Sequence, residues 1–452
     1  MDDKTDLTRG PILRRLMYLS VPIIGSQTIN MLYNLADMFW MGRLGSEEVA
    51  ATGAAGLYIW LSIAFMYLGS VGASIGVSGA IGSGDREKAK AYTNTALFIS
   101  LVCGAGIALA MITLRSQMAG FFNFREANVA KYTENYLAVT AIGIPLTYIS
   151  ATLGAVFTAA GNSRTPFIYN TIGICINMVL DPILIFTLNF GIMGAAYSNV
   201  IGQVISCTTL LVLMKKSKKR PFEDIKFFTA PKWDDVIWIL KKTLPISAES
   251  LLFTFLVMVT SRREAFFGAD AMAMSRVGSQ IESLTWLVGG AFGTALVAYI
   301  GQNYGAKKPE RIKATYRTAS LVMLCYGAFI AFLLAVPGKY LFGLFLPDPE
   351  LIERSVLYLR ILAICQIPMC LESVSSNTFR GLGKTIPPAV INTACNIIRV
   401  PLVYLLSAEF LGLGLRGVWI GISASACIKG IWSYSWYYYT EKKADREQIS
   451  SL

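Results

Sequence analysis

The chain has 452 residues, of which 54% are hydrophobic and only 15% are charged, with a formal net charge of +12. Soluble domains contain about 25% charged residues, so this composition excludes an ordinary soluble protein. Apolar stretches such as 95–114 and 319–336 separate short clusters of charge. Each stretch is long enough to cross a hydrocarbon core of ~30 Å as a helix, which predicts an all-α polytopic membrane protein.

Several residue types limit the chemistry of the chain. It contains no histidine, so any proton transfer must fall to carboxylates. Its eight cysteines lie in apolar stretches without a metal-site CxxC pair, which predicts core packing rather than a metal site. The sequence lacks a phosphate-binding GxxxxGK(S/T) motif, and we expect neither enzymatic activity nor a cofactor.

The hydrophobic pattern predicts twelve spans, arranged as two pseudo-symmetric six-helix bundles. We expect an amino-terminal lobe at 1–214, a basic linker at 215–234, a carboxy-terminal lobe at 235–440 and a tail at 441–452. The predicted helices cover about residues 12–40, 47–80, 90–114, 130–157, 165–187, 191–214, 235–261, 271–302, 314–343, 351–380, 386–408 and 412–439.

Lysine and arginine gather in the loops on one side of the predicted bundles. Cytoplasmic loops of membrane proteins are enriched in these residues, so we expect an inner-membrane protein with both termini in the cytoplasm. The same placement argues against nucleic acid as the partner of the positive charge. The clusters on this side are Arg9, Arg14 and Arg15; Arg86, Lys88 and Lys90; Lys215, Lys216, Lys218, Lys219 and Arg220; Lys307, Lys308, Arg311 and Lys313; and Lys442, Lys443 and Arg446.

The two halves of the sequence repeat. Residues recur at a constant offset of 223, which later becomes 222. Six spans per repeat is an even number, so both copies enter the membrane from the same side, as in parallel-repeat transporters. This layout predicts a cleft between two bundles and alternating access by rocking. The matching pairs include Pro22 and Pro245, Gly82 and Gly305, Pro145 and Pro368, and then Gly161 and Gly383, and Pro166 and Pro388.

Polar residues within the spans of the first half predict a binding site, because an ionisable group in a membrane is costly. Asp37 lies in the first predicted helix, and Asn177 and Asp181 share one face of the fifth because they are four residues apart. The sixth helix contributes Ser198 and Asn199. Such oxygen atoms suit a hard cation such as Na⁺ or one shared proton.

The repeat favours a functional role for this acidic pair. The positions equivalent to Asp37 and Asp181 in the second half are Thr260 and Val403. A structural feature of the fold is expected in both copies. The alternatives are an interfacial salt bridge between Asp37 and Arg43, and a helix-end cap at Asp181.

The second half carries its own ionisable residues within spans. A pair formed by Glu282 or Glu372 with Arg276 or Arg399 is as compatible with a structural role as with substrate contact. Tyr33 is a candidate for cation–π contact with flat cations. Glu264 stands beside Arg262 and Arg263, which predicts an interfacial charge cluster. The candidates for substrate contact are Glu249, Glu282, Glu372, Arg399, Tyr33 and Asn34.

Over nearly its whole length, the chain resembles the multidrug and toxic compound extrusion (MATE) family. The passages that carry the resemblance are Pro22, Tyr33 to Asp37, Gly42 to Gly45, Ala160 to Pro166, Asn177 to Phe186 and Gly194 to Ala196, then Pro245, Glu249, Arg380 to Thr385 and Arg399 to Leu402. The resemblance implies two six-helix lobes, a central cavity and antiport of organic cations against Na⁺ or H⁺.

The resemblance also implies a coupling site in the first lobe. The family uses an aspartate in helix 1, an asparagine and an aspartate in helix 5, and a threonine in helix 6. Asp37, Asn177 and Asp181 match these positions, and Asn199 stands at the position of the threonine. An amide in place of a hydroxyl leaves the ion preference open, and no other metal site is expected.

We therefore expect a multidrug antiporter that works as a monomer in the lipid bilayer on organic cations or drugs. The first alternative is a flippase for lipids or lipid-linked oligosaccharides of the same superfamily. Such flippases tend to be longer and to line their cavity with basic residues, whereas this first lobe has acidic residues. A receptor or a channel is a weaker alternative, because a repeat-built cleft with an acidic site in one half is what coupled transport requires.

Overall fold

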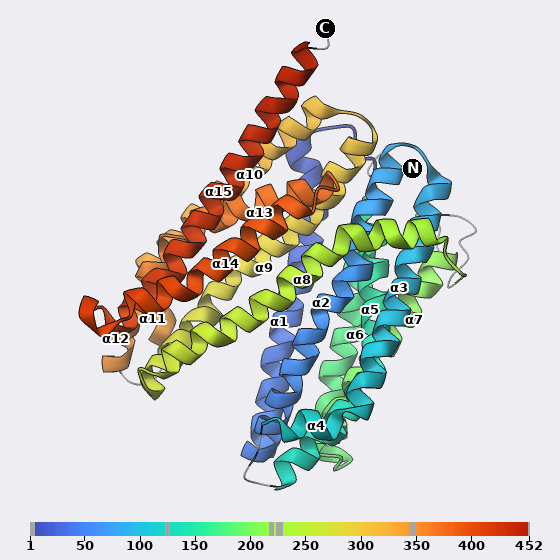
Figure 1. The fold of residues 1–452 in the computed structure, drawn as a ribbon. Coiled ribbons are helices and arrows are strands. Elements are labelled where there is room, and N and C mark those ends of the chain that lie inside the picture. Colours follow the sequence, from blue (N-terminus) through green and yellow to red (C-terminus); the bar gives the residue numbers. More distant parts are fainter. Residues whose placement is uncertain are drawn as a thin grey trace. The chain divides into compact units, whose positions relative to one another are not determined.

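The computed structural model describes residues 5–122, 124, 127–216, 221–222, 229–343 and 349–450. Within these ranges the chain forms fifteen α-helices, one π-helical turn and one 3-10 turn, and no β-strand (Figure 1). The prediction of an all-α protein is therefore confirmed. Lys218, Lys219 and Arg220 of the predicted basic linker lie outside the described residues.

The chain divides into two compact units. The first consists of Met1–Ser247 and Gly301–Lys308, and the second of Ala248–Ile300 and Pro309–Leu452. The predicted lobe and linker boundaries remain predictions. The first unit contains α1 (Ile12–Leu44), α2 (Ser46–Gly82), α3 (Arg86–Thr113), α4 (Arg115–Gly120), α5 (Ala127–Ala159), α6 (Arg164–Pro182), the turn η1 (Ile183–Thr187), α7 (Ile192–Lys216) and the beginning of α8 (Trp233–Ala265).

The second unit contains the rest of α8 and most of α9, whose last residues belong to the first unit. Its elements are α9 (Ala269–Gly305), α10 (Pro309–Ala335), α11 (Gly338–Gly343), α12 (Pro349–Ala363), α13 (Gln366–Gly381), α14 (Ile386–Leu406), the turn η2 (Glu409–Leu411) and α15 (Gly414–Ser450). Within this unit α14 packs on α15, and α13 packs on both α10 and α15.

The described helices account for the twelve predicted spans. Nine are long and apolar enough to cross a membrane, and α12 with α13, which are bent by 42° at their break, make a tenth if the two helices are counted as one span. The remaining two are α1, with 33 residues, and α15, with 37 residues. Both carry charged residues, which lowers their mean hydropathy without shortening them.

The repeat is visible in the helices themselves. Helices α1 and α8 both have 33 residues, and α2 and α9 both have 37. The short helices α4 and α11 both have six residues and occupy equivalent places after α3 and α10. The bent pair of α12 and α13 occupies the place that the single helix α5 has in the first half.

Two spans of the second half were predicted as continuous helices, and the structure shows that each is interrupted. The span predicted at 314–343 ends at Ala335, and α11 is a separate helix. Pro337 explains this break, because proline disfavours the helical conformation of the residue before it. The span predicted at 351–380 is broken between Ala363 and Gln366. Pro368 cannot donate a hydrogen bond to the carbonyl group four residues earlier, which permits a bend there.

Helices α2, α3, α5 and α7 pack tightly in the first unit, side by side in Figure 1. A Cβ atom on Gly104 would lie 2.7 Å from the Cα of Pro145, so only glycine allows α3 to approach α5 this closely. Between the same helices, the hydroxyls of Ser100 and Thr152 share a hydrogen bond of 2.7 Å. Against this scaffold, α6 packs on α7, and α1 packs on α6.

Candidate functional site

The first candidate site lies where α1, α6 and α7 meet in the first unit. Asn177 and Asp181 are both buried, at 6% and 0% exposure, so the four-residue spacing does place them on one inward face of α6. Asp181 is the last residue before Pro182, and the π-helical turn η1 follows. Proline lacks a backbone donor, so the regular α-helical pattern ends beside this carboxylate.

Hydrogen bonds connect these side chains across three helices. The Tyr33 hydroxyl donates to Oδ1 of Asn199 at 2.7 Å, and Nδ2 of Asn177 donates to the same oxygen at 3.0 Å. Nδ2 of Asn199 donates to the carbonyl of Ala195 at 3.0 Å. Asn199 is thereby held in one orientation by α1, α6 and its own helix. The Ser198 hydroxyl completes the set by donating to Oδ1 of Asp181.

Three oxygen atoms of this site are buried without a hydrogen-bond donor among the described residues. They are Oδ1 of Asp37, Oδ2 of Asp181 and Oδ1 of Asn177. A buried polar atom without a partner costs about 1–3 kcal/mol, and more when it is charged. No lysine or arginine of the described chain lies within 4.0 Å of either carboxylate. The oxygen atoms therefore form a set that can accept a cation or a proton.

The structural alternative for Asp37 is not observed. The guanidinium of Arg43 lies over the ring of Phe39, 4.8 Å from its centre, and 5.9 Å from that of Trp40. In the described part of the chain, Arg43 and Asp37 form no salt bridge. Asp37 instead lies within electrostatic range of Asp181.

One further residue belongs to this site, and one predicted candidate does not. Tyr136 of α5 is buried, contacts the side chain of Asn199 and lies within electrostatic range of Asp37 and Asp181. Tyr136 was not predicted as a site residue, because a tyrosine within a span is usually a packing residue and nothing in its spacing distinguishes it. The side chain of Asn34, a predicted candidate for substrate contact, is exposed and takes part in none of the contacts described above.

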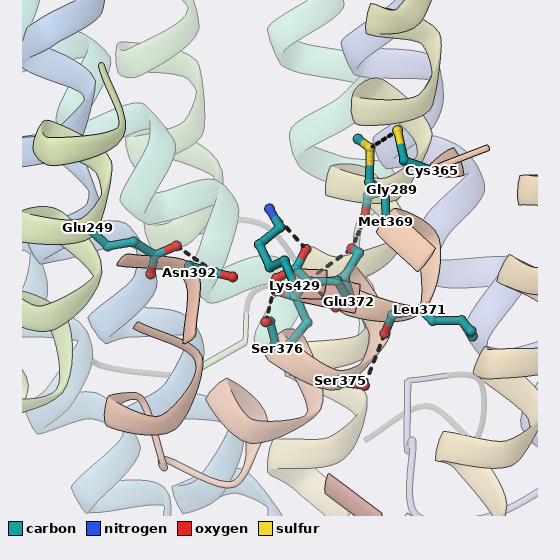
Figure 2. A network of polar contacts seen from close by, with 12 residues as sticks. Glu249, Gly289, Cys365, Met369, Leu371, Glu372, Ser375, Ser376, Asn392 and Lys429 are labelled. Atoms are coloured by element: carbon teal, nitrogen blue, oxygen red, sulfur yellow. Dashed lines mark hydrogen bonds and ion pairs between the residues drawn. The ribbon is translucent and has the colours of Figure 1, made fainter. Parts of the chain in front are cut away.

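The candidates of the second half lie in the second unit, where Glu249 and Glu372 form ion pairs; Figure 2 shows the surroundings of these two glutamates. Glu249 of α8 accepts a hydrogen bond from Nδ2 of Asn392 at 2.7 Å, and its other oxygen lies 3.5 Å from the guanidinium of Arg380. Asn392 and Arg380 were not predicted as partners. Arg380 was noted only as part of the motif that carries the family resemblance.

Glu372 pairs with a lysine rather than with an arginine. Its Oε1 accepts from the hydroxyl of Ser376 at 2.6 Å, and its Oε2 lies 3.9 Å from Nζ of Lys429 on α15 (Figure 2). Lys429 is 5% exposed, and its ammonium lies 5.5 Å from the ring centre of Trp286. Lys429 was not predicted as a site residue, although an ionisable residue within an apolar stretch is itself the signal.

Glu282 and Arg399 occupy a third position. Glu282 contacts the side chain of Gln366 and lies within electrostatic range of Arg399. The Nε of Arg399 donates to the hydroxyl of Ser425 at 2.9 Å. Of the proposed glutamate–arginine combinations, the structure therefore brings Glu282 near Arg399.

Glu264 differs from its prediction. It is 9% exposed and contacts Ser275, with Arg276 within electrostatic range. Arg263, its neighbour in sequence, donates to the side chain and carbonyl of Ser407 at 2.8 and 2.9 Å. The predicted interfacial cluster of Glu264 with Arg263 is wrong, because successive residues of a helix point in different directions.

The buried carboxylates of the two units differ in whether a basic side chain lies near them. In the second unit, Glu249, Glu282 and Glu372 each have a basic side chain within electrostatic range. Among the described residues, Asp37 and Asp181 of the first unit have no such basic partner. No three of His, Cys, Asp and Glu gather as a metal site in the described chain. A cation in the first unit would have to rely on carboxylate and amide oxygens together.

Comparison with known proteins agrees with the fold and the repeat. The MatE family model matches residues 22–183 and again residues 245–405. The chain belongs to the MatE family. The two matches start 223 residues apart and end 222 residues apart, which are the two offsets of the sequence repeat. As a MatE-family member the chain is a multi-pass membrane transporter and not an enzyme.

Relatives of this MatE-family chain match it almost end to end. The probable multidrug resistance protein NorM of Thermotoga maritima is 26% identical over 419 residues, which cover 91% of this chain and 89% of the relative. The probable multidrug resistance protein YpnP of Bacillus subtilis is 26% identical, with 97% and 98% covered. A relative from Shewanella oneidensis, 25% identical with 96% of each chain covered, is named an FAD transporter.

Solved structures show the same fold. An outward-facing multidrug resistance MATE family transporter of the MOP superfamily superposes with a TM-score of 0.91 at 22% identity, covering 98% of this chain and 99% of that one. A MOP superfamily transporter from Pyrococcus furiosus superposes with a TM-score of 0.88 at 24% identity and covers 98% of both chains. That transporter is described as having a binding pocket of reverse polarity.

Proposed function

We propose that this MatE-family chain is a secondary active multidrug antiporter, which exports organic cations in exchange for Na⁺ or H⁺ by alternating access. Asp37, Asn177, Asp181 and Asn199 form the coupling-ion site. The names of the relatives, among them the multidrug export protein MepA of Staphylococcus aureus, support the substrate class. The coupling ion is inferred from the site itself.

The observation that carries this proposal is the set of buried oxygen atoms without donors on Asp37, Asn177 and Asp181. Two carboxylates and an amide oxygen supply the hard ligands that Na⁺ prefers. The same two carboxylates can share one proton, because their charges repel one another and a proton relieves this repulsion. Either ion provides a partner for these buried oxygen atoms.

The neighbouring hydrogen bonds support a site that is ordered before the ion arrives. Ser198 fixes one oxygen of Asp181, so that the other oxygen keeps its orientation. Asn177 donates through its amide nitrogen to Asn199, which leaves its carbonyl oxygen available for a cation. Ion binding offsets one of the two negative charges of Asp37 and Asp181, relieves the repulsion between them and changes the packing of α1 against α6. This change drives the exchange of access between the two sides of the membrane.

The test is substrate efflux from proteoliposomes that hold the purified protein. An inward Na⁺ gradient and an inward H⁺ gradient are imposed separately on the wild type, on Asp37→Asn and on Asp181→Asn. We expect one of the gradients to drive efflux in the wild type and neither to do so in the two variants. Asp234→Asn is the matched control, because Asp234 is an exposed aspartate at the start of α8 and should retain wild-type efflux.

The panel of substrates includes lipophilic cations and an anionic dinucleotide, since one relative is named an FAD transporter. Efflux of cations that depends on neither gradient would contradict the antiporter, and transport of lipid-linked sugars alone would favour the flippase alternative.

We also propose that the protein works as a monomer without nucleic acid or cofactor. Its place is the inner membrane, with both termini in the cytoplasm.

A further inference from the structure

The second unit contains a buried ammonium group that is surrounded by acidic residues from other helices. Nζ of Lys429 on α15 lies 3.9 Å from Oε2 of Glu372 on α13. It is also within electrostatic range of Glu249 on α8 and Glu282 on α9. In Figure 2 the lysine side chain extends toward the carboxylate of Glu372. One cationic group thus lies within range of carboxylates from three helices.

The contacts that hold this ammonium are long. The distance of 3.9 Å to Glu372 is within ion-pair range but beyond that of a hydrogen bond. Among the described residues, Lys429 donates no hydrogen bond. Glu372 does not depend on the lysine for its orientation, because Ser376 donates to its other oxygen at 2.6 Å. The carboxylate would therefore remain in place if another cation took the position of the lysine.

An aromatic ring completes the surroundings of the ammonium. Lys429 Nζ lies 5.5 Å from the ring centre of Trp286, within the range of a cation–π interaction. Trp286 is 48% exposed, whereas Lys429 is buried. A carboxylate beside an exposed indole ring has the chemistry that recognises a flat or lipophilic organic cation, with the ring covering its apolar body.

We propose that Glu372 and Trp286 form a subsite for organic cations, and that Lys429 is a tethered competitor that occupies this subsite and sets its affinity. This inference rests on the proposed export of organic cations. A substrate must displace the lysine ammonium, so part of its interaction with Glu372 is offset by the interaction that the lysine loses. Lys429 is a specificity-determining residue, because it selects against cations too small to contact Trp286.

The test is equilibrium binding of tetraphenylphosphonium to purified protein in lipid nanodiscs, measured by calorimetry without any ion gradient. Lys429→Met keeps the length of the side chain but removes the competing charge, and it should bind the probe roughly tenfold more tightly, or about 1.4 kcal/mol. Lys429→Arg keeps the charge and should bind like the wild type. Adding Glu372→Gln to Lys429→Met should abolish the gain.

Lys429→Gln provides a second neutral variant, with a polar side chain, in case the methionine variant does not fold. Unchanged or weaker binding in the neutral variants that fold would overturn the proposal, as would an equal gain in Lys429→Arg. Binding needs no gradient and does not involve Asp37. Loss of coupled efflux in the earlier experiment therefore tests the antiporter separately from this subsite.

Discussion

Tyr33 and Asn199 are 166 positions apart in the sequence, and the hydroxyl of Tyr33 donates to Oδ1 of Asn199 at 2.7 Å. This bond joins α1 to α7 at the candidate coupling site. Asn199 is also joined to α6 through Asn177. One amide oxygen thus receives donors from two other helices, so that a change in any of these helices alters its position. Asn199 is suited to transmit ion binding to the packing of α1.

Replacing Tyr33 by phenylalanine should weaken coupling without unfolding the protein. The ring remains, but the donor to Asn199 is lost at a cost of about 1 kcal/mol. We expect the ion concentration for half-maximal efflux to rise roughly fivefold, which corresponds to that energy. The measurement is efflux against a series of ion gradients in proteoliposomes. Tyr197→Phe, at an exposed tyrosine on α7, should match the wild type, and an equal effect there would refute a specific role of Tyr33.

Replacing Asp181 by asparagine should abolish coupling while leaving thermal stability the same or higher. Asp181 is fully buried, with one oxygen that accepts no hydrogen bond and no basic partner among the described residues. Removing an unpaired buried charge relieves its desolvation cost, and Ser198 can still donate to the amide oxygen. The measurement is the unfolding temperature of the detergent-solubilised protein. A fall of several degrees would mean that the carboxylate is structural.

The sequence predicted the parts of the site that local spacing determines. The four-residue spacing of Asn177 and Asp181 defines one helix face, and both residues are buried. The repeat offset predicted that the second half reproduces the helices of the first. No spacing rule relates α1 to α6 and α7, so Asp37 and Asn199 were grouped with this pair only as polar residues within spans and through the family resemblance.

What the sequence did not predict depends on packing between distant segments. Tyr136 reaches the site from α5, and a tyrosine in a span carries no mark of its neighbours. Pro145 and Pro368 are equivalent in the repeat, but α5 is continuous whereas the chain bends before Pro368. The proline alone therefore does not determine the bend. Lys429 was different, because its charge within an apolar stretch was visible in the sequence.

Replacing Gln302 by alanine should loosen the amino-terminal segment of the first unit. Oε1 of Gln302 accepts from the backbone N–H of Leu7 at 3.2 Å, and its Nε2 donates to the carbonyl of Ala159 at 2.7 Å. Leu7 is fully buried. Losing both bonds and leaving their partners buried should cost about 2–4 kcal/mol.

The loosened segment should be cleaved faster by protease near its amino terminus, and the unfolding temperature should fall. Gln280→Ala is the control, because Gln280 is an exposed glutamine on the same helix. Cleavage of Gln302→Ala at the wild-type rate, with the unfolding temperature unchanged, would show that these two bonds do not hold the segment.

Replacing each of two glycines on α2, Gly79 and Gly82, by alanine should change the unfolding temperature in opposite directions. A Cβ atom on Gly82 would lie 2.0 Å from the carbonyl oxygen of Gln302, and the repeat-related Gly305 would bring its Cβ equally close to the carbonyl of Gly79. Backbone atoms cannot move aside as a flexible side chain does, so Gly82→Ala must separate the ends of α2 and α9. The constant offset between Gly82 and Gly305 therefore reflects a reciprocal close contact in the first unit.

Gly79 lies three positions earlier on the same helix, and its Cβ would meet no atom within 4 Å. Alanine is favoured over glycine within a helix by about 1 kcal/mol, so Gly79→Ala should raise the unfolding temperature slightly. Gly82→Ala should lower it by several degrees, because the clash is with backbone. Both variants are compared with the wild type in the same detergent. Equal shifts for the two substitutions would mean that α2 and α9 do not approach as closely as the structure describes.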